Sequence, residues 1–108
     1  FCAHNGIENK IIDTLNNREL SKGELYIILD DKNLIRIIKR IKDEHLTLAK
    51  DIGIISYNDT LLKEIVEGGI TTISTNFNLM GERLAEMILN SEFAQVENPN
   101  RLIQRKSL

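Results

Sequence analysis

The stretch DIGIISYNDT, residues 51–60, contains a signal for the fold and a signal for a binding site. Residues 52–55 are apolar or small, as in a strand that is buried inside a parallel sheet. Residues 56–60 are a run of side chains that form hydrogen bonds. In α/β proteins ligands bind at the carboxyl ends of parallel strands, so a polar cluster after a buried strand indicates a binding edge.

Strand and helix patterns alternate along the chain. Apolar runs and helical spacing of apolar residues predict, in order, helix 6–17, strand 25–29, helix 32–45, strand 52–56, helix 60–67, strand 70–74, helix 77–90 and an edge strand within 101–108. The run at 25–29 is typical of a strand that is buried on both faces. This alternation indicates βαβ units. We therefore expect an α/β fold of three layers, with a parallel central sheet and helices on both faces.

The composition limits what kind of protein this is. With 108 residues, 42% of them hydrophobic, the chain forms one domain or one part of a larger protein. A formal net charge of −2 argues against nucleic-acid binding by this chain itself, which needs a concentrated basic face. No apolar run approaches the roughly 20 residues of a membrane-spanning helix, so no membrane contact is expected. The start FCAHNG lacks a signal-peptide pattern and an initiator methionine, so we expect the chain to begin within a longer protein.

Residues that most often bind metals or form disulfides are few in this sequence. Cys2 is the single cysteine and cannot form an internal disulfide, which fits a reducing cytoplasm. Together with His4 and His45 it shows no metal-ligand spacing. The segment GERLA, residues 81–85, contains no phosphate-loop pattern. We therefore expect neither a metal nor a cofactor.

Two of the strands end in polar pairs, Asp30-Asp31 and Asn58-Asp59. A right-handed crossover brings both pairs to the same edge of the sheet. A carboxylate accepts hydrogen bonds from two hydroxyl groups, and a carboxamide both donates and accepts. Asp30 and Asn58 are thus suited to the vicinal hydroxyls of a polyol or a sugar.

Helix capping is the alternative explanation for these pairs, because strand-to-helix turns often end in a capping side chain. We assign Asp31 and Asp59 as the caps and Asp30 and Asn58 as the ligand-facing members. His4 lies in another strand-to-helix turn, where a surface or capping role is more common than ligand binding. The basic face of helix 32–45 is most simply a solvated face.

The segments IILDD, DIGIISYNDT, ITTISTNF and MGERLAEMIL, in this order, resemble the LacI/GalR family of bacterial transcription regulators. The resemblance implies a two-lobed sensor domain of the periplasmic-binding-protein-like type, joined to an N-terminal helix-turn-helix head. A small effector, usually a sugar, binds between the lobes of such proteins and changes their affinity for operator DNA. This chain resembles the C-terminal part of the sensor domain, without the DNA-binding head.

By this resemblance the ligand-binding positions are Asp30, Asn58, His4 and Thr75. The sequence departs from the family pattern at the strand tips, because the amide and the carboxylate are exchanged between Asp30 and Asn58. Ser56 also replaces a usual glycine, and Gly68-Gly69 replaces a common pair of prolines. The effector therefore cannot be identified from these residues.

The resemblance also implies a dimer and a division into lobes. The implied interface consists of Leu34, Ile35, Ile38, Leu61, Leu62 and Ile65, although some of these residues could instead belong to an ordinary core. Residues 1–74 would form the C-terminal lobe, 75–98 a crossover and helix of the N-terminal lobe, and 99–108 a return strand. Without the second lobe, the apolar face of helix 77–90 should pack on a second copy, swap between chains or fold back.

The leading interpretation is the effector-sensing and dimerising portion of a sugar-responsive, cytoplasmic repressor. Its partners would be a small-molecule effector, a second copy of the chain, and operator DNA only through the absent head. A solute-binding protein of the same fold, working in transport, is the first alternative. A small α/β enzyme that uses Asp30 and Asn58 is the second. The lack of a nucleophile–base pair counts against that enzyme.

Overall fold

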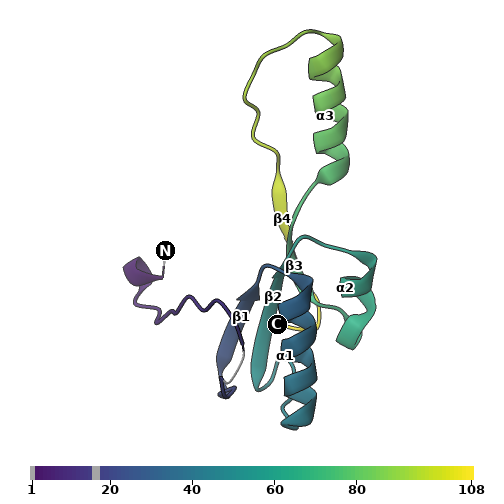
Figure 1. The fold of residues 1–108 in the computed structure, drawn as a ribbon. Helices are drawn as coiled ribbons and strands as arrows, with labels where there is room; N and C mark the ends of the chain where they lie inside the picture. Colours follow the sequence, from purple (N-terminus) through teal and green to yellow (C-terminus); the bar gives the residue numbers. More distant parts are fainter. Residues whose placement is uncertain (1, 16–17) are drawn as a thin grey trace.

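The computed structural model describes residues 2–15 and 18–108. Its centre is a four-stranded sheet in the order β1-β2-β3-β4 (Figure 1). The strands are β1 (Glu24–Ile28), β2 (Ile52–Tyr57), β3 (Thr71–Thr75) and β4 (Asn100–Ile103). The first three are parallel, and β4 pairs antiparallel with β3. The expected α/β class with a mainly parallel sheet is confirmed.

Helices connect the parallel strands, as such connections require. The helices are η1 (Ala3–Asn5), α1 (Asp31–Asp43) after β1, α2 (Leu61–Ile65) with the 3-10 helix η2 (Val66–Gly68) after β2, and α3 (Phe77–Leu89) after β3. The strands and the later helices thus lie within a few residues of their expected bounds. The helix expected at 60–67 is shorter, because the backbone becomes extended at Val66, with a ψ of 130°, and Glu67 follows with a φ of +54°.

The core lies between α1 and one face of the sheet. Leu34, Ile37 and Ile41 recur at helical spacing on α1 and are buried. They form one cluster with the buried side chains of the first two strands, which are Tyr26, Ile28, Ile52 and Ile54. Burial of each such apolar side chain contributes roughly 1.5–3 kcal/mol, so this cluster fixes α1 against β1 and β2.

The opposite face of β1 is open, which corrects the expectation of a strand buried on both sides. Leu25 and Ile27 are 51% and 63% exposed, whereas their neighbours Tyr26 and Ile28 are buried. In the part of the chain that the structure describes, no helix covers Leu25 and Ile27. This face of β1 is therefore open to solvent among the described residues.

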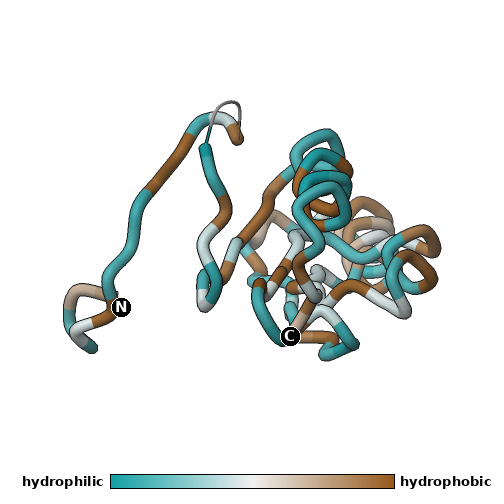
Figure 2. Tube along the Cα trace, turned by 90° about the horizontal axis from the view of Figure 1, so that it is seen from below, coloured by the Kyte–Doolittle hydropathy of each residue, from teal (hydrophilic) through white to brown (hydrophobic). Residues whose placement is uncertain are grey.

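The helix predicted at 6–17 is also not formed over its described part. Residues 7–15 are irregular, and residues 16 and 17 lie outside the described part of the chain. Leu15 is buried in the core, but Ile7 and Ile11 are exposed. Figure 2 shows the beginning of the chain as an extended arm apart from the sheet. A helix this short is marginal in water unless its apolar face packs, and here half of that face has no partner.

The C-terminal tail completes the sheet between β2 and β3. The Ser107 hydroxyl donates to the Ile54 carbonyl and accepts from the Thr71 N–H, each at 2.7 Å. The Ser107 carbonyl accepts from the Ile54 N–H at 2.8 Å. Because β3 pairs with β2 only from Ile55 onward, the tail satisfies backbone groups that this pairing leaves open.

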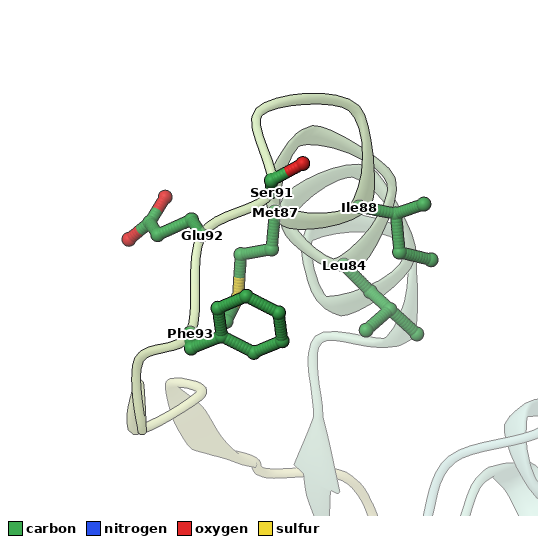
Figure 3. Close-up of a pocket in the computed structure, with 6 residues that line it drawn as sticks. All are labelled: Leu84, Met87, Ile88, Ser91, Glu92 and Phe93. Atoms are coloured by element: carbon green, nitrogen blue, oxygen red, sulfur yellow. The ribbon is translucent and has the colours of Figure 1, made fainter.

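Helix α3 and the segment after it stand away from the sheet (Figure 1). None of the residues of α3 is buried. At its far end a cavity of about 310 Å³ is lined by Leu84, Met87, Ile88 and Phe93, among others (Figure 3). The helix expected at 77–90 is confirmed, and its apolar side chains are exposed to solvent except for the half-buried Met87.

Candidate ligand-binding edge

The candidate site lies at the carboxyl edge of β1 and β2. These strands are parallel, with Ile28 opposite Ser56. Asp30 lies two residues beyond Ile28, and Asn58 lies two residues beyond Ser56. The register therefore brings the two strand tips to the same edge, where ligands bind in sheets of this kind.

Asp30 is the N-cap residue of α1. One carboxylate oxygen accepts from the Asn33 N–H at 2.9 Å, and the other accepts from the Asn33 side-chain amide at 2.8 Å. These bonds, the backbone one first, hold the pKa of Asp30 below its usual value. Asp30 is exposed, and an ionised carboxylate has about four acceptor positions. It can therefore cap α1 and still accept hydrogen bonds from a ligand.

Asn58 has a left-handed backbone, with a φ of +57°. Asparagine tolerates this conformation better than most residues. Its N–H donates to the Ile73 carbonyl at 2.8 Å, which ties the tip of β2 to β3. Its side-chain oxygen is buried and has no hydrogen-bond partner in the described part of the chain. Such groups are rare in native proteins, so this oxygen is an unused acceptor at the tip of β2.

Asp59 is held by the C-terminal tail. Its two carboxylate oxygens accept from the two terminal nitrogens of Arg105, each at 2.7 Å. Thr72 donates a third hydrogen bond at 3.1 Å. The Arg105 hydrogen bonds are the main reason that the pKa of Asp59 is lowered, and the Thr72 bond adds to the effect. The pair fixes the residue that follows Asn58 and leaves Asp59 little capacity for a ligand.

The short helix α2 buries its lysine and exposes its apolar residues. The Lys63 side chain is 4% exposed, whereas Leu61 and Ile65 are 83% and 74% exposed. The ammonium group donates to the Tyr57 and Asn58 carbonyls, each at 2.8 Å. It also lies 2.9 Å from a carboxylate oxygen of Asp31. An ammonium group has three donors, and three acceptors surround this one, which explains how the charge is buried.

A second cavity, of about 370 Å³, lies beside the edge where β3 continues into α3. It is lined by Asp59, Ser74, Thr75, Asn76, Phe77, Asn78, Arg101 and Ile103. Thr75 thus belongs to the same edge of the sheet, although Asp30 and Asn58 do not line this cavity. Among the described residues, no three His, Cys, Asp or Glu side chains gather as metal ligands would. No described helix is long and apolar enough to cross a membrane.

The chain matches one protein family over almost its whole length. Residues 5–108 match the family model of the periplasmic binding protein-like domain. The chain belongs to this family. The resemblance that the strand-tip motifs suggested is confirmed at the level of family and fold. A search of the curated proteins gives no match.

Solved structures of periplasmic binding protein-like domains share the fold. The lac repressor dimer bound to operator and the anti-inducer ONPF is 23% identical, with a TM-score of 0.64 over 77% of this chain and 31% of that one. A putative LacI regulator from Bacillus cereus subsp. cytotoxis is 22% identical, with a TM-score of 0.62 over 78% and 32%. A putative LacI-family repressor from Corynebacterium glutamicum is 23% identical, with a TM-score of 0.61 over 77% and 34%. The chain spans about a third of the length of each.

The structure corrects which residues of this family member cap the helices. Asp30, and not Asp31, is the N-cap of α1, and Thr60, and not Asp59, is the N-cap of α2. Asp31 and Asp59 instead form the ion pairs with Lys63 and Arg105. Helix α1 begins one residue earlier than expected and α2 one residue later, so capping falls to Asp30 and Thr60.

Two further expectations are changed by the positions of the side chains. His4 lies in η1, within the arm that stands apart from the sheet, so the structure does not bring it to the binding edge (Figure 1). Leu34 is 5% exposed and belongs to the core, so it is not free to form an interface. Ile38 is partly buried against the core, while Ile35, Leu61, Leu62 and Ile65 are exposed.

Sequence reasoning did not identify Lys63, Arg105 and Ser107 as parts of this architecture. A signal for Lys63 was present, because it lies on the helical face opposite Leu61, Leu62 and Ile65. Arg105 and Ser107 lie in the tail, far along the chain from their partners Asp59 and Ile54, and no local pattern marks them.

Proposed function

We propose that this chain is the effector-sensing and dimerising part of a LacI-type transcriptional repressor. The effector is a sugar or a related polyol that binds at the edge containing Asp30 and Asn58. The observation that carries this proposal is the pair of strand tips, with an exposed carboxylate after one strand and an unpaired amide oxygen after its parallel neighbour. The similarity to solved structures of the lac repressor and of LacI-type regulators favours a repressor over a transport protein.

The proposed sensor has two lobes. Residues 1–74 form one lobe, residues 75–98 belong to the other, and residues 99–108 return to the first. The position of α3 away from the sheet and the apolar cavity at its end support this division. An effector bound between the lobes favours one lobe arrangement, and that arrangement changes the operator affinity of the attached DNA-binding heads in the cytoplasm.

Thermal-shift screening of the complete protein against a panel of sugars and sugar phosphates tests the function, with and without operator-like DNA. We expect one sugar to raise the melting temperature and to change the affinity for DNA. Stabilisation without any effect on DNA binding would instead support the transport protein. No response to any sugar would contradict the proposed effector class.

The proposed dimer forms through the exposed apolar residues of α1 and α2. These are Ile35, Leu61, Leu62 and Ile65, with a contribution from Ile38. An exposed apolar patch on a helix whose polar residue points inward marks an interaction site. The ion pair between Lys63 and Asp31 joins α2 to the start of α1.

Sedimentation equilibrium of the chain tests this dimer. The double variant Leu61→Ser with Ile65→Ser should weaken association by at least about tenfold, which corresponds to roughly 1.4 kcal/mol. Leu102→Ser is the matched control, because Leu102 is an exposed leucine on β4, outside the proposed patch. Equal weakening by the control would contradict an interface on α1 and α2.

A further inference from the structure

Lys63 is the structural link between the binding edge and the apolar surface of α2. Its ammonium group contacts the last residue of β2 and the residue that follows it, at the Tyr57 and Asn58 carbonyls. The same group contacts Asp31, the first residue of α1, which directly follows Asp30. One buried atom therefore touches the backbone of one candidate ligand-binding residue and the chain neighbour of the other.

The Lys63 side chain is buried against the two backbone carbonyls, and the Asp31 carboxylate, which is 63% exposed, adds a third contact. All three oxygens lie within 2.9 Å of the ammonium group, and the side chain is 4% exposed. If α2 moved away from the strand tips, the ammonium group would lose these acceptors while it is still buried. An uncompensated buried charge is strongly unfavourable. The tip of β2, the start of α1 and α2 should therefore move as one unit.

The outer face of the same helix carries Leu61, Leu62 and Ile65. Lys63 lies in the same five-residue helix as these side chains, so a contact on the outer face acts on the element that carries Lys63. We propose that Lys63 is a positioning residue that couples contact at the α2 surface to the placement of Asp30 and Asn58. This inference rests on the proposed function, because it takes a second copy of the chain as the partner at that surface.

Two backbone amides report the two ends of this link. The Asn33 N–H donates to the Asp30 carboxylate, so its hydrogen exchange reports the placement of Asp30. The Asn58 N–H donates to the Ile73 carbonyl, so its exchange reports the tip of β2. The probe is the chain itself, because raising its concentration populates the dimer, and sedimentation measures the dimer fraction in the same samples.

The experiment is amide hydrogen exchange by NMR at low and high concentration. In the wild-type chain, dimerisation should slow both amides about threefold, a local stabilisation that exchange resolves. Asp31→Asn removes only the ion pair between Lys63 and α1. In this variant dimerisation should no longer slow exchange of the Asn33 amide, but should still slow exchange of the Asn58 amide. Lys63→Met should lose both responses. Lys42→Met is the matched control, because its ion pair with Glu67 also joins α1 to η2 but contacts neither strand tip, and it should keep both responses.

The possible outcomes separate this inference from the proposed function. If dimerisation of Asp31→Asn and Lys63→Met slows hydrogen exchange at both amides as it does in the wild type, Lys63 does not have the proposed role. The proposed dimer would still hold in that case. A wild-type dimer that slows neither amide would also overturn the proposed role of Lys63. A chain that stays monomeric at every concentration would refute the proposed dimer and the coupling with it. If Lys63→Met does not fold, the Asp31→Asn comparison alone decides, because Asp31 is exposed.

Discussion

Replacing Arg105 by glutamine removes the clamp that joins the C-terminal tail to the tip of β2. Arg105 donates to both oxygens of Asp59 and to the Ile70 carbonyl, at 2.7, 2.7 and 2.9 Å. The Arg105 and Asp59 side chains are 15% and 23% exposed, which places the pair between a surface and a buried ion pair. Surface pairs contribute about 0–1 kcal/mol, and breaking a buried pair costs roughly 3–5 kcal/mol. We therefore expect Arg105→Gln to lower the free energy of unfolding by about 2 kcal/mol.

Urea unfolding at several pH values measures this effect and its cause. With a slope of about 1.5 kcal/mol/M, the midpoint should fall by roughly 1.3 M at pH 7. Because Arg105 lowers the pKa of Asp59 in the folded chain, the stabilisation is complete above the unfolded pKa, about 3.9. It is lost as the pH falls through the lower, folded pKa. The difference between wild type and variant should thus be constant from about pH 7 to 5 and narrow below about pH 4.

Arg83→Gln is the control for this measurement. Arg83, on α3, forms an ion pair with Glu92, and both of these side chains are more exposed than those of Arg105 and Asp59. The control should leave the midpoint unchanged. A loss in Arg105→Gln no greater than that of the control, or a difference that stays constant down to pH 3, would refute the argument.

Three further predictions concern the same edge. Ser107→Ala leaves the buried Ile54 carbonyl and Thr71 N–H without this partner, and should lower the free energy of unfolding by about 2 kcal/mol in urea; no loss would contradict the role of the tail. Gly69→Ala should cost about 1–3 kcal/mol in the same assay, because φ is +109° and a Cβ would lie 2.7 Å from Arg105 Cδ; a neutral result would show that the turn relaxes freely. Asn58→Gly relieves the left-handed backbone, so the free energy of unfolding, measured by thermal unfolding, should change by less than about 1 kcal/mol. The same variant should bind the sugar that the screen identifies at least about tenfold more weakly in calorimetry. Unchanged binding would show that Asn58 is not part of the site.

Much of the fold follows from local patterns in the sequence. The apolar runs that ended in polar residues predicted the strands, their parallel order and the edge shared by Asp30 and Asn58, because each signal lies within a few neighbouring residues. These patterns could not predict that Asp30, rather than Asp31, caps α1. Both residues are good N-caps, and the choice depends on where α1 begins, to within one residue.

The remaining differences have longer-range causes. Residues 7–15 have a helical pattern, but a short helix needs a packed apolar face, and Ile7 and Ile11 have no such packing. Lys63 is buried because the end of β2 presents two carbonyls that need donors, and this demand overrides the usual rule that lysine faces water. Arg105 reaches Asp59 from 46 residues away, a pairing that only the folded sheet creates.

The central claim is that the carboxylate of Asp30 binds the effector in addition to capping α1. Asp30→Ser separates these roles, because serine is a good N-cap but carries no carboxylate. The measurement is calorimetric titration of the complete protein and of this variant with the sugar that stabilises the wild type in the screen. We predict that Asp30→Ser keeps its melting temperature without sugar and binds that sugar at least about tenfold more weakly. Equal affinity in the two proteins would show that Asp30 is only a helix cap and would contradict the proposed site.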